Sequence, residues 1–166
     1  MTKLRVFGLI AVLVAAASIA AASAQTQTLR SHHVKGPDAL ELTYTKWIAP
    51  GYPNLAAGFP NLVGVVGGDI VGKFGGAVYE RTVNGSLVHL DAIYIVIAPD
   101  PAKSFTAHVK GTEDLNTLKA VLVGRVVDGF LNGAHVHVEF DVINCTQAPS
   151  GTCFQGTISV RRSSHD

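Results

Sequence analysis

The segment H-V-H-V-E places two imidazoles and a carboxylate at alternating positions, His135, His137 and Glu139. Alternate residues of a β-strand share one face, so these side chains would line up, and they are of types that bind zinc or copper. The residues between and after them are apolar, which is typical of a half-buried strand with a solvated outer face. A metal also needs a ligand from a second element, and only His108 stands on a candidate neighbouring strand. We therefore predict neither a metal site nor a cofactor.

Two carboxylates stand where a predicted inward face reaches the end of its strand. Glu80 continues the face of Phe74, and Asp128 continues the face of Val126. An acid at the mouth of a barrel, desolvated by aromatic side chains such as Phe74 or Tyr94, can bind the polar end of a ligand or move a proton. Alternatively, each carboxylate reaches solvent beside a turn. The candidate ligand-binding residues are thus Phe74, Tyr94, Glu80 and Asp128, and no residue is assigned a catalytic role.

The chain contains two cysteines, Cys145 and Cys153. Their spacing is not C-x-x-C and no convincing base partner is present, which disfavours a metal pair or a catalytic thiol. Thiols this close together become oxidised outside the cytosol. We predict a disulfide, which would stabilise the fold by about 2–3 kcal/mol on the loop-entropy account.

Alternation of polar and apolar residues predicts strands along almost the whole chain after residue 38. The predicted strands cover residues 39–48, 62–66, 69–81, 86–98, 104–110, 117–127, 134–144 and 152–161. Asn84-Gly85 and Asn132-Gly133 mark tight turns, and no long segment keeps a helical period. The expected fold is all-β, a single antiparallel β-barrel of about eight strands over residues 38–162, with a β-sandwich as the alternative.

The first 24 residues have the build of a secretory signal peptide. Lys3 and Arg5 precede an uncharged apolar run that ends in Ala22-Ser23-Ala24. We expect cleavage before Gln25, a flexible leader over residues 25–37, a frayed tail over 163–166, and a secreted or periplasmic protein without stable membrane insertion. The alternative, a membrane anchor, requires a longer apolar run of roughly 20 residues.

Charge excludes nucleic acid as a partner. Two of the 13 basic residues and none of the 12 acidic ones precede Gln25, so the mature part carries a net charge of about −1. It contains no basic block, and nucleic-acid binding needs clustered Lys and Arg.

Residues 92–97 break the half-polar pattern, because both faces of this predicted strand are apolar. One face would fill the core. The other, with Ile93, Ile95 and Ile97, needs a cover, which leaves a homo-oligomer open as an option.

The segments G-D-I-V-G-K-F-G-G-A-V, A-I-Y-I-V, F-T-A-H-V-K-G, A-V-L-V-G-R-V-V-D-G and C-F-Q-G-T-I-S-V resemble the allene oxide cyclase-like barrels, a group that includes plant dirigent proteins and bacterial exported proteins. The similarity spans roughly residues 62–160 and rests on glycine-punctuated strands. It implies an eight-stranded barrel with an apolar cavity, often in trimers, in which plant members guide cyclisation or radical coupling of hydrophobic substrates. No local motif matches their catalytic residues, so none is carried over.

Three functions remain, in order of preference. The first is binding of a small hydrophobic ligand in the barrel, the second is a cyclase or isomerase acting on an apolar substrate, and the third is a structural or interaction module of the cell envelope. A purely apolar pocket would favour the first, a pocket with a buried carboxylate of raised pKa the second, and a barrel filled by side chains the third. The identity of the ligand does not follow from the sequence.

Overall fold

The computed structural model describes residues 39–49 and 61–163, so the predicted signal peptide (1–24), the leader (25–37) and nearly all of the tail (163–166) lie outside the described residues. The described residues form eight strands and one short 3₁₀ helix. These elements are β1 (Ala39–Ala49), β2 (Asn61–Gly68), β3 (Gly72–Asn84), β4 (Leu87–Ile97), η1 (Pro101–Lys103), β5 (Phe105–Asp114), β6 (Lys119–Gly129), β7 (His135–Asn144) and β8 (Thr152–Arg161).

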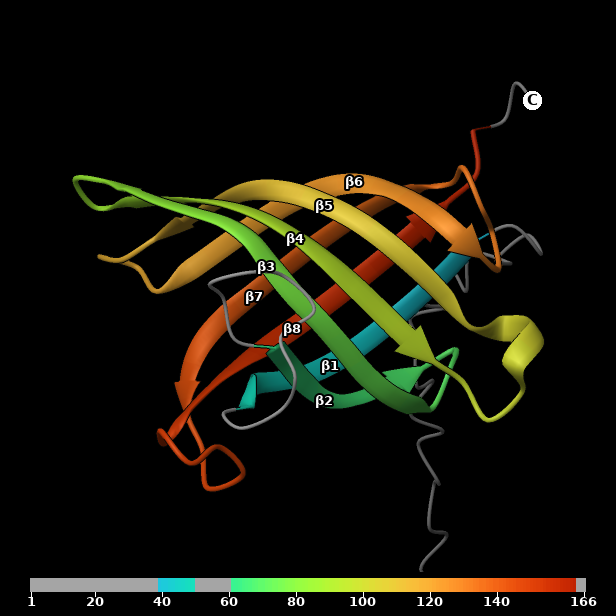
Figure 1. The fold of residues 1–166 in the computed structure, drawn as a ribbon, viewed down its shortest axis with the longest axis horizontal. Coiled ribbons are helices and arrows are strands. Elements are labelled where there is room, and N and C mark those ends of the chain that lie inside the picture. Colours follow the sequence, from blue (N-terminus) through green and yellow to red (C-terminus); the bar gives the residue numbers. More distant parts are fainter. Residues whose placement is uncertain (1–38, 50–60, 164–166) are drawn as a thin grey trace, which may run out of the picture. The chain divides into compact units, whose positions relative to one another are not determined.

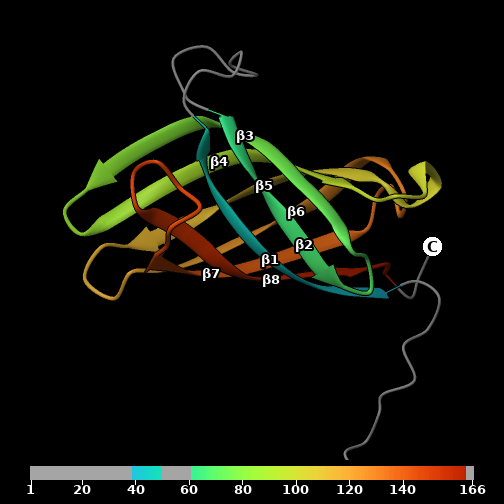
Figure 2. The ribbon, with the colours of Figure 1, turned by 90° about the horizontal axis from the view of Figure 1, so that it is seen from below.

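The strands form a closed antiparallel barrel, which confirms the predicted fold class. Each strand pairs with its neighbours in sequence, and β1 pairs with β8 to close the sheet. Figures 1 and 2 show β1 lying between β2 and β8. Closure gives each strand a hydrogen-bonded neighbour on both sides, so no strand forms an edge of the sheet along its full length.

Alternation along each strand fills the interior with apolar side chains. In β5 the buried apolar residues are Phe105, Ala107 and Val109, and in β7 they include Val136 and Val138, as the sequence pattern predicts. The hairpin predicted at Asn84-Gly85 joins β3 to β4, with Gly85 and Ser86 as the turn residues and a positive φ of 61° at Gly85.

Two β-bulges interrupt this alternation. In β3 the register shifts between Val78 and Glu80, and in β6 a shift opposite Thr106 and Ala107 leaves Val127 as the extra residue. A bulge adds one residue to one strand, so every later residue of that strand changes faces. The residues that follow therefore point opposite to the direction that strict alternation predicts.

Glycines on the inner face let neighbouring strands approach closely. A Cβ at Gly156 in β8 would lie 1.8 Å from the carbonyl oxygen of Glu139, and one at Gly124 in β6 would lie 1.9 Å from that of His108. The glycines are needed where the sheet coils tightly.

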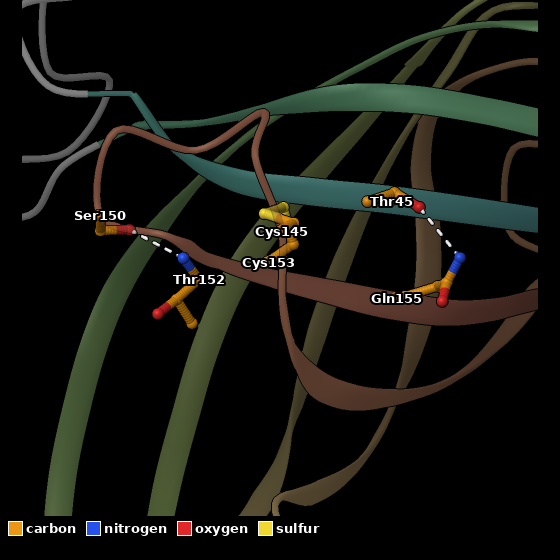
Figure 3. The surroundings of a disulfide bond; sticks show 6 residues. All are labelled: Thr45, Cys145, Ser150, Thr152, Cys153 and Gln155. Atoms are coloured by element: carbon orange, nitrogen blue, oxygen red, sulfur yellow. Dashed lines mark hydrogen bonds between the residues drawn. A yellow bond between two sulfur atoms is a disulfide. The ribbon is translucent and has the colours of Figure 1, made fainter.

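The predicted disulfide between Cys145 and Cys153 is confirmed, with the two Cα atoms 5.7 Å apart. It closes the loop between β7 and β8 (Figure 3). The turns at residues 85–86, 115–118 and 145–151 lie at the same end of the barrel, because each follows an odd-numbered strand of the meander. We call this end the disulfide end.

Replacing Gly156 by alanine is expected to lower the free energy of unfolding by about 1–3 kcal/mol, because the added methyl group meets backbone that cannot move aside. Gly75→Ala is the matched control, since a Cβ there has its nearest neighbour at 3.8 Å. Chemical denaturation of both variants under non-reducing conditions measures the difference. Equal stability of the two variants would contradict the close-approach account.

Candidate functional site

A cavity of about 120 Å³ runs into the barrel from the disulfide end. At its outer side lie Ile48, which is 37% exposed, and the exposed Arg81, whereas Lys46 and Tyr94 at its inner side are buried. The remaining walls are almost entirely apolar. They consist of Leu62, Val78, Leu90, Ala92, Leu122, Phe140, Phe154 and the carboxyl-bearing Glu113.

Lys46 is the most unusual residue of this cavity, because only 3% of it is exposed. Alternation in β1 places it on the inner face, after the buried Leu42 and Tyr44. A lysine is almost never fully buried unless it is paired. The burial of this amine therefore needs an explanation from its surroundings.

Aromatic rings take the place of water around the Lys46 amine. Among the described residues, five rings have their centroids between 4.0 and 5.8 Å from Nζ. They belong to Tyr44, Phe74, Tyr94, Phe140 and Phe154. Ring faces attract a cation at such distances, which offsets part of the lost hydration.

The amine nevertheless shifts toward its neutral form. Burial lowers the pKa of Lys46 well below its usual range, and the negative charge of Glu113 only partly opposes this shift. Among the described residues no carboxylate forms an ion pair with Lys46; its Nζ donates a hydrogen bond to the Tyr94 hydroxyl instead. The unprotonated form, which this shift favours, carries a lone pair on Nζ.

Two tyrosine hydroxyls lie in the interior beside the amine. Burial raises the pKa of Tyr94 and of Tyr44, so both stay protonated. Tyr94 accepts the hydrogen bond from Lys46 and keeps its own hydrogen for another acceptor. The neighbouring Tyr94 also raises the pKa of Tyr44, whose hydroxyl has no hydrogen-bond partner among the described residues.

Glu113 provides the carboxyl group of the cavity. It lies near the end of β5 and is 9% exposed, and burial raises its pKa while Arg81 and Lys46 pull it down. Among the described residues no ion pair engages its carboxylate directly. The cavity thus holds an amine of lowered pKa and a carboxyl group of raised pKa, which is an arrangement found at sites of acid–base chemistry.

Of the residues that the sequence singled out, Phe74 and Tyr94 lie inside the barrel. Their rings meet edge to face with centroids 4.9 Å apart. Tyr94 lines the cavity, and Phe74 packs behind it against the ring of Tyr44 at 5.5 Å.

The expectation that Glu80 points inward is wrong. The bulge after Val78 shifts the register, so Glu80 pairs with Asp91 on the outer face and Arg81 pairs with the inward-facing Leu90. Arg81 therefore takes the place at the cavity that alternation assigned to Glu80.

The expectation that Asp128 follows the inner face of β6 is wrong for the same reason. The extra residue Val127 turns Asp128 outward, where it pairs with Thr106 and is exposed. The carboxyl group at the cavity is Glu113 instead.

The alternating residues His135, His137 and Glu139 lie exposed on the outer face of β7, with His137 and Glu139 hydrogen-bonded at 3.0 Å. Within residues 39–49 and 61–163 no group of three or more histidine, cysteine, aspartate or glutamate side chains is arranged to hold a metal. His108 is hydrogen-bonded to Asp91.

The apolar outer face of β4 is only partly exposed to solvent. Ile93 and Ile95 are half-buried, and Ile97 is exposed. A homo-oligomer stays a prediction.

Lys46 and Glu113 were not among the residues selected from the sequence. A signal for Lys46 exists, because Leu40, Leu42, Tyr44 and Lys46 alternate within one predicted strand. Glu113 gives a weaker signal, since the predicted strand ended at residue 110 whereas β5 continues to Asp114.

The chain matches no protein-family model, no curated protein and no solved structure. In the described part of the chain, no helix is long and apolar enough to cross a membrane.

Lys46→Met is expected to remove a pH-dependent part of the stability. In the unfolded chain this lysine is protonated below about pH 10.4, whereas burial disfavours the protonated form in the folded state. The unfolded state therefore binds more protons, and the contribution of Lys46 to the free energy of unfolding falls as the pH is lowered toward the folded-state pKa. The free energy of unfolding of the wild type, relative to Lys46→Met, should rise with pH between about 7 and 9.5, by at most about 1.4 kcal/mol per pH unit.

Lys110→Met is the control for this comparison. The ion pair of Lys110 with Asp91 raises the pKa of Lys110, so this lysine stays charged in both states over the same pH range. The difference in free energy of unfolding between the wild type and Lys110→Met should therefore not change with pH in this range. If the difference in free energy of unfolding between the wild type and Lys46→Met were also independent of pH, it would refute the lowered pKa of the buried amine.

Proposed function

We propose that the barrel binds a small, largely apolar molecule whose polar end is a carbonyl oxygen. The ligand lies in the cavity with its carbonyl group toward Lys46 and Tyr94. The observation that carries this proposal is the placement of an amine and a phenol hydroxyl, both buried, at the inner side of a cavity whose other walls are apolar except for Glu113 and Arg81.

The donors at the inner side favour an uncharged acceptor. A carbonyl oxygen can accept from the free hydrogen of the Tyr94 hydroxyl and from the second hydrogen of the Lys46 amine. A buried donor that lacks an acceptor raises the free energy of the complex by about 1–3 kcal/mol. A ligand with a carbonyl oxygen therefore binds more tightly than one without it.

The size of the cavity limits the ligand. A dry engineered cavity of about 150 Å³ accommodates benzene, and the cavity here has about 120 Å³. A short chain therefore fits inside the cavity, and a ligand with a ring extends in part past Ile48 and Arg81 toward solvent.

A catalytic role is the second candidate, and the cavity meets the criterion stated for it, because Glu113 is a buried carboxyl group whose pKa is raised. Glu113 and Lys46 have pKa values shifted toward one another within one cavity, which suits proton transfer on a bound carbonyl compound. An isomerase would use this pair, whereas a carrier would need only the hydrogen-bond donors. The cavity also argues against a barrel filled by side chains, as a purely structural module would have.

We further propose that the protein acts outside the cytosol, as a secreted or periplasmic protein. The Cys145–Cys153 disulfide supports this location, because such bonds persist in oxidising compartments. The signal-peptide pattern of residues 1–24 supports it independently.

Acetophenone and ethylbenzene form a matched pair of probes for the ligand site. They differ in the carbonyl oxygen, and one additional hydrogen bond corresponds to roughly tenfold tighter binding of acetophenone. Tyr94→Phe should reduce this preference, because the Lys46 amine remains as the one donor, and should leave the binding of ethylbenzene unchanged, as measured by calorimetry or ligand-observed NMR.

Tyr79→Phe is the control, because Tyr79 is exposed on the outer surface. It should retain the preference for acetophenone. The proposed function fails if neither probe binds, or if acetophenone binds equally well to the wild type and to Tyr94→Phe.

A further inference from the structure

We propose that the ε-amine of Lys46 forms an imine with a small aldehyde bound in the cavity. The inference rests on the proposed function, since the aldehyde must first enter the carbonyl site. It goes beyond that function by making the bond covalent and by naming aldehydes as the ligand class.

Lys46 differs from the other lysines of the described chain in its surroundings. Lys110 and Lys119 extend into solvent, where their amines pair with Asp91 at 2.6 Å and with Asp141 at 2.9 Å. The Lys46 amine lies among rings and donates its hydrogen bond to a neutral hydroxyl. A desolvated lysine in an apolar pocket is the form that attacks carbonyl groups, because it carries less charge and a free lone pair.

The walls of the cavity favour an apolar aldehyde. Leu62, Leu90, Ala92 and Leu122 offer no hydrogen bonds, so the carbonyl oxygen is the one polar atom that the inner side of the cavity can satisfy. Aromatic and short aliphatic aldehydes meet both requirements of size and polarity.

The reaction balances with the groups that are present. The nitrogen lone pair attacks the carbonyl carbon, a C–N bond forms, and the carbonyl π electrons move to the oxygen. The Tyr94 hydroxyl gives its proton to this oxygen and takes one from the nitrogen, which yields a neutral carbinolamine. The hydroxyl group then departs as water with the second proton of the nitrogen, and the C=N bond forms. Neither an oxidant nor a reductant takes part in these steps.

The position of the amine also protects the product. Water reverses imine formation, and the inner side of the cavity is bordered by apolar and aromatic side chains. Exclusion of water therefore shifts the equilibrium toward the imine.

The test uses the full chain, benzaldehyde or the smaller propanal, and sodium cyanoborohydride, which reduces an imine to a stable amine. Intact mass spectrometry should show one dominant adduct, with the mass of the aldehyde less one oxygen atom. Peptide mapping should place it on Lys46, labelled at least about tenfold faster than Lys110 at neutral pH, because an exposed lysine is almost fully protonated there. Lys46→Met should lose this adduct, and Lys110→Arg should keep it.

Tyr94→Phe tests the proton relay separately. It should slow labelling of Lys46 about tenfold and leave labelling of Lys110 unchanged. Labelling that favours the exposed lysines, in wild-type protein that binds acetophenone, would overturn the imine and leave the carbonyl site standing. Absence of both acetophenone binding and Lys46 labelling would overturn the carbonyl site and the imine together.

Discussion

The ammonium or amine group of Lys46 inside a closed apolar barrel is the constraint on which the candidate site depends. A charged amine in such a place loses hydration that no ion pair restores among the described residues. Aromatic rings and the Tyr94 hydroxyl recover part of this free energy, and the lowered pKa favours the neutral amine, which needs less hydration. The burial of Lys46 therefore has two consequences. It lowers the stability of the fold, and it places a nucleophile and a hydrogen-bond donor at the inner side of a cavity.

Two irregularities of the sheet determine which charges join this lysine. The bulge in β3 brings Arg81 to the cavity and moves Glu80 outside, and the bulge in β6 turns Asp128 to solvent. Glu113 reaches the cavity because β5 is regular up to its end. As a result, Arg81 and Glu113 share the outer part of the cavity, and the deeper part contains the lysine and the rings.

The fold could be read from the sequence to a large extent, and the site only in part. Alternation, turn glycines and two closely spaced cysteines predict a disulfide-linked barrel, because these patterns depend on local geometry. Phe74 and Tyr94 follow from the same alternation. Glu80 and Asp128 were placed wrongly, since the sequences around Tyr79 and Val127 do not reveal a one-residue bulge and one such residue inverts every later position. The sequence prediction does not include Lys46 although this residue alternates with Tyr44, because lysine is mostly a surface residue.

The titration of the Lys46 amine tests the central claim most directly. In protein labelled with ¹⁵N at the lysine side chains, the Nζ resonance of Lys46 can be assigned by its absence from Lys46→Arg. The account predicts a titration midpoint well below the value of about 10.4 that is ordinary for lysine. A midpoint at or above that value would show a stably protonated amine and would contradict the account.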